Sequence, residues 1–115
     1  MTAELVVGLP VLCAVTLALV WLLSVGAAQV RTVDAAREAA RALARGDDPA
    51  AAVAIGQRVA PAGVRVAVAA EGDRVVARAS GVVPGPGGLL RFLPGARVRA
   101  EAVALSEAPA AGTPP

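Results

Sequence analysis

The chain has 115 residues, of which 57% are hydrophobic and 17% are charged, and its formal net charge is +2 at pH 7. This length allows one small domain at most. Every basic residue is arginine, and the arginines alternate with acids instead of forming a block, so no nucleic-acid partner is expected.

An uncharged apolar run from Leu5 to Val30 follows a single carboxylate, Glu4. As a helix, its 26 residues span roughly 39 Å, whereas the hydrocarbon core of a bilayer needs about 20 residues. Signal peptides have a shorter apolar region and a basic start, so the run predicts an uncleaved transmembrane helix over residues 5–30. A signal peptide cut after "SVGAA", which leaves a mature N-terminus near Gln29, is the alternative.

Three residues stand out inside this run. Gly8 and Pro10 weaken the helix near its start, because proline removes a backbone hydrogen bond. They form either a harmless kink near the membrane surface or a soft point that lets the helix adjust in an assembly. Cys13 is the only cysteine and is expected to pack in lipid or against a neighbouring helix, so no disulfide framework or metal site is predicted.

The helix is expected to continue in water over residues 31–46 and to end at Gly46. One stripe at helical spacing carries its apolar side chains. The members of this stripe are Val30, Val33, Ala36, Ala40 and Leu43. Asp48 as N-cap and Pro49 at the first position then predict a short helix over residues 48–60, ended by Pro61.

Residues 63–105 change to a period of two, which predicts an antiparallel β head. Its strands are "GVRVAVAA", "RVVARASGVV" and "ARVRAEAVAL", and the turn "EGD" joins the first two. In the middle strand, Val75, Ala77 and Ala79 share one face. The loop "PGPGG" precedes "LLRFLPG", whose Leu89, Leu90, Phe92 and Leu93 are expected to lie under the sheet, and residues 106–115 are expected to be disordered.

These elements together predict an α+β protein in which a long rod carries a small head at one end. A long N-terminal helix is transmembrane in its first half and amphipathic in its second. A short second helix and a small three-stranded antiparallel sheet follow. Three strands bury little by themselves, so the aqueous half of the long helix is expected to cover the valine face of the sheet.

The composition argues against catalysis. The chain has no His, no Lys and no Tyr, and its only thiol lies in the apolar run. Ser24, Ser80 and Ser106 have no plausible base, and Asp47 and Asp48 are interpreted as helix-cap residues. We therefore expect no enzyme activity, no metal, no cofactor and no small-molecule substrate, and a function carried by shape and association.

Three segments of the sequence resemble the TadE-like minor pilins, or pseudopilins, of tight-adherence type IV pilus systems, in particular their short actinobacterial versions. They are "TAELVVGLP" at the start of the membrane helix, "QVRTVDAAREAARALARGD" leaving it, and "VAPAGVRVAV" before the sheet. The resemblance implies a pilin-like fold and a structural subunit. It also implies membrane lipid, other pilin-like subunits and the pilus assembly machinery as partners.

The family resemblance also suggests a role for Glu4. In pilins, a glutamate a few residues into the mature chain is thought to pair with the free N-terminal amine of a neighbouring subunit, which sets the axial register. The simpler interpretation is that Glu4 favours a helix N-terminus, worth about 0.3–1 kcal/mol, and extends to the headgroups. The resemblance favours the register role.

Processing and topology leave alternatives open. The family is made with a short basic leader that a prepilin peptidase removes, whereas residues 1–4 correspond at most to a truncated leader or mature N-terminus. Pilin-type insertion places the C-terminal domain outside the cytoplasm, in a single-pass membrane protein or at the pilus surface. The arginines after the helix oppose this by the positive-inside rule, which an upstream basic leader would offset. The alternative function is a single-pass accessory protein whose small domain binds a partner.

Overall fold

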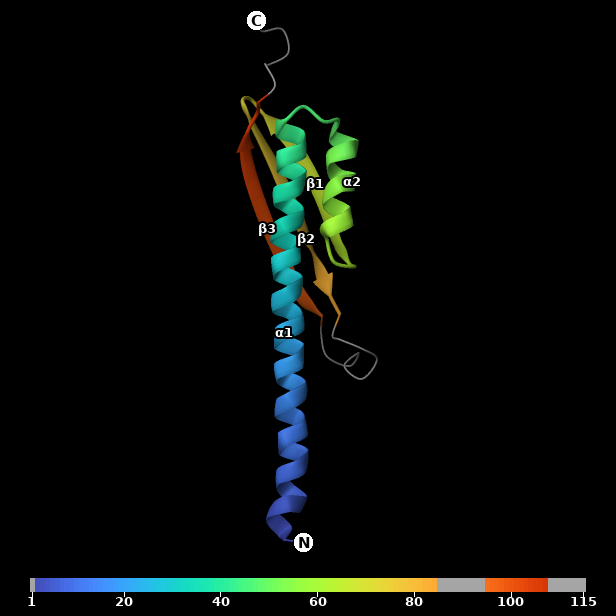
Figure 1. Ribbon diagram of the computed structural model, residues 1–115, viewed down its shortest axis with the longest axis vertical. Coiled ribbons are helices and arrows are strands. Elements are labelled where there is room, and N and C mark those ends of the chain that lie inside the picture. Colours follow the sequence, from blue (N-terminus) through green and yellow to red (C-terminus); the bar gives the residue numbers. More distant parts are fainter. Residues whose placement is uncertain (1, 85–94, 108–115) are drawn as a thin grey trace, which may run out of the picture.

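A single long helix runs the whole length of the molecule and carries a small head at one end (Figure 1). The computed structural model describes residues 2–84 and 95–107. Its principal dimensions are 82 × 19 × 16 Å. The described elements are α1 (Ala3–Ala44), α2 (Pro49–Val59), β1 (Val64–Glu71), β2 (Arg74–Val83) and β3 (Ala96–Leu105). The predicted α+β arrangement of two helices and a three-stranded antiparallel sheet is confirmed.

Helix α1 is continuous over 42 residues, through Pro10 and through the point where the apolar run ends. It ends as the sequence predicts, since Gly46 has a φ of 101°, in the left-handed region that glycine adopts readily. The N–H groups of Arg45, Gly46 and Asp47 donate to carbonyls of the last turns of α1, at 3.1–3.2 Å. These bonds close the helix and turn the chain toward α2.

Helix α2 runs back along the head end of α1. Asp48 occupies its N-cap position and Pro49 its first turn, as predicted, but the Asp48 side chain makes no capping hydrogen bond. The backbone carbonyl of Asp48 accepts the N–H of Ala52 at 2.9 Å instead. After α2, Gly63 has a φ of 89° and starts the return into β1.

The sheet has the order β1-β2-β3, and both pairs of neighbours are antiparallel. The register places Val68 opposite Ala77 and Ala77 opposite Ala102, so residues of one face line up across all three strands. Gly72, with a φ of 64°, makes the tight turn between β1 and β2. Both helices lie on the same face of the sheet (Figure 1).

The core between the helices and the sheet is built almost entirely from alanine and valine. The sheet contributes Val64, Val66, Val75, Ala77, Ala79 and Val98, all buried, which confirms the predicted inward face of β2. Helix α1 contributes a surface of alanines, and α2 presents the buried Gly56 to it. Small side chains on both sides let the backbones approach closely, so the head is compact although it contains few large residues.

The predicted apolar stripe of α1 is wrong in one member and incomplete. Val30 is 60% exposed, whereas Thr32, Ala35 and Ala39 are fully buried. Almost every position of this segment that is not charged is alanine or valine, so hydropathy alone does not select one face. The hydroxyl of Thr32 donates to the Ala28 carbonyl at 2.7 Å, which satisfies this buried polar group within the helix.

The start of the predicted disordered tail is ordered. The N–H of Ser106 donates to the Asp73 carbonyl at 2.7 Å, and the N–H of Glu107 donates to the Ala44 carbonyl at 2.8 Å. The rest of the tail, residues 108–115, and the predicted apolar segment with Leu89, Leu90, Phe92 and Leu93 lie outside the described residues.

Candidate assembly surface

The first half of α1 is an apolar cylinder that the rest of the described chain leaves uncovered. Large side chains along it are exposed from Leu5, at 51%, to Leu23, at 74%. By length and composition this is one helix able to cross a membrane, and no part of its most apolar 18-residue window is buried. It is therefore not a core helix of the head, and its apolar surface is available to lipid or to other helices.

Glu4, Gly8 and Pro10 belong to the first turns of α1. Figure 1 shows that this end of α1 is remote from the head. Glu4 is exposed in the first turn, where a carboxylate is favoured by the helix dipole. Gly8 has no other atom near the place a Cβ would occupy. Pro10 lies inside the helix and lacks the N–H that would bond the Val6 carbonyl. The geometry leaves both interpretations of this end open.

Two polar side chains mark the apolar half of α1. The hydroxyl of Thr16 donates to the Leu12 carbonyl at 2.8 Å, so it is satisfied within the helix. Trp21 is half-buried, and its Nε1 is buried without a hydrogen-bond partner among the described residues. Tryptophan is enriched where membranes meet water, so its position one to three turns before the head agrees with a boundary there.

Each outer edge of the sheet is closed by a glutamine that the sequence analysis did not single out. On β3, the Gln29 side chain from α1 donates to the Arg99 carbonyl at 2.9 Å and accepts the Arg99 N–H at 3.4 Å. On β1, the Gln57 side chain from α2 donates to the Val64 carbonyl at 3.0 Å and accepts the Val66 N–H at 2.8 Å. Unpaired edge groups invite pairing with other chains, so both glutamines protect the head against unspecific strand addition.

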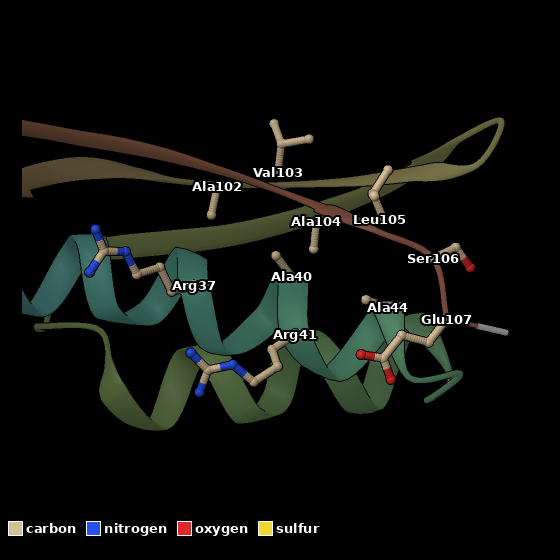
Figure 2. Close-up of a pocket in the computed structure, with 10 residues that line it drawn as sticks. All are labelled: Arg37, Ala40, Arg41, Ala44, Ala102, Val103, Ala104, Leu105, Ser106 and Glu107. Carbon is tan, nitrogen blue, oxygen red and sulfur yellow. The ribbon is translucent and has the colours of Figure 1, made fainter.

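A groove of about 420 Å³ lies between α1 and β3 near the tip of the head (Figure 2). Figure 2 shows Ala102 and Ala104 pointing toward α1, whereas Val103 and Leu105 point away from it. Arg37 and Arg41 line the groove on the α1 side. The Arg41 guanidinium binds the Glu38 carboxylate at 3.1 Å, and both side chains are exposed.

The outward face of the sheet carries most of its charge. The guanidinium of Arg78 on β2 binds the Glu101 carboxylate on β3 at 3.0 Å, across directly paired positions. This hydrogen bond and the negative charge of Glu101 raise the pKa of Arg78 above its ordinary value. Arg65, Arg97 and Arg99 lie on the same face.

The remaining polar residues singled out in the sequence do not gather at one place. Residues 2–84 and 95–107 contain no group of three His, Cys, Asp or Glu side chains that could hold a metal ion. Ser80 lies on the outward face of the sheet among arginines, and Ser24 lies on α1 just before the head. The largest feature that remains without a partner in the described part of the chain is the apolar half of α1.

Comparison with known proteins identifies the same part of the molecule. No curated protein and no solved structure shows significant similarity to the chain. Residues 1–41, which comprise the apolar half of α1 and most of its continuation along the head, match the family model described as "TadE-like protein".

Proposed function

We propose that this chain is a structural, non-enzymatic pilin-like subunit of a tight-adherence type IV pilus or of its assembly complex. The supporting observation is that the segment matching the TadE-like model is also the uncovered apolar helix. A helix of this kind can be stored in a membrane and then transferred to a bundle of identical helices, because both surroundings are apolar. The arginine-only basic set and the Ala-, Gly- and Pro-rich composition support the actinobacterial type.

In this proposal Glu4 sets the axial register between subunits. A carboxylate at the centre of a dry helix bundle is costly unless a positive group offsets it, and the N-terminal amine of a neighbouring copy is the nearest candidate. Glu4 lies in the first turn of α1, directly adjoining the apolar surface that would pack, so such pairing fixes one offset along the helix. Gly8 and Pro10 act as the soft point that lets this turn adjust.

The test compares Glu4→Gln with Glu38→Gln, which makes the same chemical change at a partly exposed position on the head. Sheared-surface and membrane fractions of producing cells are probed for the protein. We expect the parent and Glu38→Gln in the sheared fraction, and Glu4→Gln in the membrane fraction alone. If Glu4→Gln enters the sheared fraction as efficiently as the parent, the register role is wrong.

The parent chain itself tests the broader proposal. If it is absent from the sheared fraction under conditions where pili form, the function as a filament subunit fails. Membrane retention together with recovery of a stable partner complex would support the single-pass accessory protein instead. N-terminal sequencing of both fractions reports whether a prepilin peptidase processes the protein.

The proposal places the head outside the cytoplasm. Helix α1 ends in the head without any second described segment able to return through the membrane. Protease is added to cells whose outer layers have been permeabilised and whose cytoplasmic membrane is still sealed. A head outside the cytoplasm should be degraded, whereas the apolar half of α1 should be spared. Protection of the head would place it in the cytoplasm, as the positive-inside rule alone suggests.

A further inference from the structure

Charged residues segregate along the long axis of the head. The end nearest the apolar half of α1 carries the start of β1, the start of β3, the end of α2 and the first aqueous turn of α1 (Figure 1). Its charged residues are Arg31, Asp34, Arg58, Arg65, Arg97 and Arg99. At the opposite tip acids outnumber arginines, since Asp47, Asp48, Glu71, Asp73 and Glu107 lie there with Arg45 and Arg74. The sequence shows no such separation, because the fold brings the arginines together from four elements.

Three of these arginines lie on the outward face of the sheet around one serine. The register places Ser80 between Arg65 on β1 and Arg99 on β3. Arg97 follows in the next outward position of β3, opposite Val82. A shallow hollow of about 540 Å³ on β2 and β3 is lined by Arg78, Ser80, Val82, Arg97 and Arg99, with Gly81 and Val98 completing it.

Most of the arginines in and beside this hollow have no acidic partner among the described residues. Glu101, the acid in the row above on the same face, already binds Arg78. Among residues 2–84 and 95–107, no ion pair forms to Arg65, Arg97 or Arg99. Guanidinium groups bind phosphate oxygens through several N–H donors each, and a neighbouring hydroxyl can donate one more hydrogen bond.

The position of the hollow along α1 identifies the source of the phosphate. A hydrocarbon core of about 20 helical residues that begins at Leu5 ends near Ser24. Gln29 lies about 7 Å beyond that point, and its amide binds the backbone of Arg99. Arg97 lies two residues earlier on β3, about 6–7 Å closer to the hydrocarbon. Headgroups occupy about 5–7 Å on each side of the core, so the hollow lies at their level.

We propose that Ser80, Arg97 and Arg99 in this hollow, together with Arg65 on the neighbouring strand, bind the phosphate of anionic phospholipid headgroups in the leaflet from which the head emerges. The inference rests on the membrane anchorage contained in the proposed function and adds a specific lipid contact for the head. Exposed Val82, at 50%, lies beside Arg97 on the same face and can contact the upper acyl chains. The head then lies against the membrane surface until α1 leaves the bilayer.

The native chain contains its own probe for this contact, because Trp21 is the only tryptophan and there is no tyrosine. The full chain is reconstituted in phosphatidylcholine bilayers that contain either brominated phosphatidylcholine or brominated phosphatidylglycerol. Bromine quenches tryptophan fluorescence at short range, so Trp21 reports which lipid gathers beside the base of the head. We expect stronger quenching by brominated phosphatidylglycerol, and we expect added salt to reduce this preference.

The test variant is the triple substitution Arg65→Gln, Arg97→Gln and Arg99→Gln. Its matched control is Arg37→Gln, Arg45→Gln and Arg74→Gln, which removes the same charge from positions nearer the tip. Both brominated lipids should quench Trp21 of the test variant equally, whereas Trp21 of the control should still be quenched more strongly by brominated phosphatidylglycerol. An unchanged preference in the test variant, or none in the parent, would overturn the proposal.

Three further arms of the experiment distinguish the lipid contact from its alternatives. If neither brominated lipid quenches Trp21, α1 is not in the bilayer, and the anchorage in the proposed function fails as well. If free inorganic phosphate abolishes the preference when chloride of equal ionic strength does not, the hollow is a site for soluble phosphate and the lipid assignment is wrong. Chemical cross-linking between copies is measured in the same samples. If both lipids quench Trp21 of the parent equally, and copies of the parent cross-link whereas copies of the test variant do not, the hollow contacts the acidic tip of a second copy instead.

Discussion

The side-chain amide of Gln29 binds both backbone polar groups of Arg99, at 2.9 Å to its carbonyl and 3.4 Å from its N–H. This contact joins positions 70 residues apart in the sequence. It fastens the outer strand of the sheet to α1 at the level where the helix enters the head. The Gln29 side chain of α1 therefore adds a polar attachment at the base of β3 to the alanine packing that joins α1 to the sheet.

Replacing Gln29 with alanine should loosen β3 at its base. Two partly exposed hydrogen bonds are lost, so we expect the free energy of unfolding to fall by about 1–2 kcal/mol. Amide hydrogen exchange on the full chain in detergent micelles should show faster exchange at Arg99. Gln29→Glu keeps an acceptor for the Arg99 N–H but places a carboxylate oxygen against the Arg99 carbonyl, so it should not restore the parent's stability. Unchanged exchange at Arg99 in the alanine variant would contradict the role of this contact.

Gln57→Ala should have the equivalent effect on the other edge of the sheet. It removes the bonds to the Val64 carbonyl and the Val66 N–H, so exchange should rise at Val66 and stay unchanged at Arg99. The two glutamines lie on opposite edges and share no partner. Their effects on stability should therefore add, to within about 0.5 kcal/mol in the double variant. A strongly non-additive result would show that the two edges open together.

Gly56→Ala should destabilise the head although alanine is the better helix former. An added Cβ would lie 3.0 Å from the Ala35 carbonyl oxygen, 3.0 Å from Val66 Cγ1 and 3.1 Å from the Ala39 Cβ. The backbone of α1 would have to shift, at a cost of about 1–3 kcal/mol, which exceeds the gain of about 1 kcal/mol in helix propensity. Urea unfolding followed by circular dichroism measures the difference.

The matched control for this change is Gly26→Ala. Gly26 also lies in a helix, but apart from the backbone of its own helix and its chain neighbours, no atom of the described residues lies within 4 Å of the place its Cβ would take. We expect the unfolding midpoint of the head to stay at the parent value in this variant. A Gly56→Ala head as stable as the parent would mean that α2 and α1 are packed less closely than described.

The stability of the head should be nearly independent of pH between about pH 6 and 9. The chain has no histidine, whose charge changes in this range. Glu101 raises the pKa of Arg78, so the contribution of this pair is complete throughout this range and is lost as the pH rises through the still higher folded value of the guanidinium. Urea midpoints at several pH values check this, with Arg78→Gln as the control. A clear change of midpoint across neutral pH would point to a titrating group outside this account.

The sequence predicted the elements well because their local signals are strong. Gly46 and the Asp48–Pro49 pair fix where one helix ends and the next begins, and the alternation of Val75, Ala77 and Ala79 fixes the inward face of β2. The sequence did not show which side of α1 is buried, because several rows of alanine along the helix have similar hydropathy. Val30 consequently proved exposed.

The contacts that position the candidate site could not be predicted, because they depend on register between distant elements. Nothing local marks Gln29 or Gln57 as partners of strand edges. Arg65 and Arg99 are 34 positions apart, and they share a row with Ser80 only because both neighbouring strands pair with β2. Glu4 stays a prediction, since its proposed partner is another copy of the chain.

The width of the molecule constrains how copies can be arranged. The Cα trace is 19 × 16 Å across, whereas helices in close contact lie about 8–10 Å apart. Two copies in the same orientation whose apolar halves touch side by side cannot hold their heads at the same height, because the heads would overlap. Neighbouring copies must therefore be displaced along the common axis or turned about it, which excludes a flat raft of identically oriented neighbours.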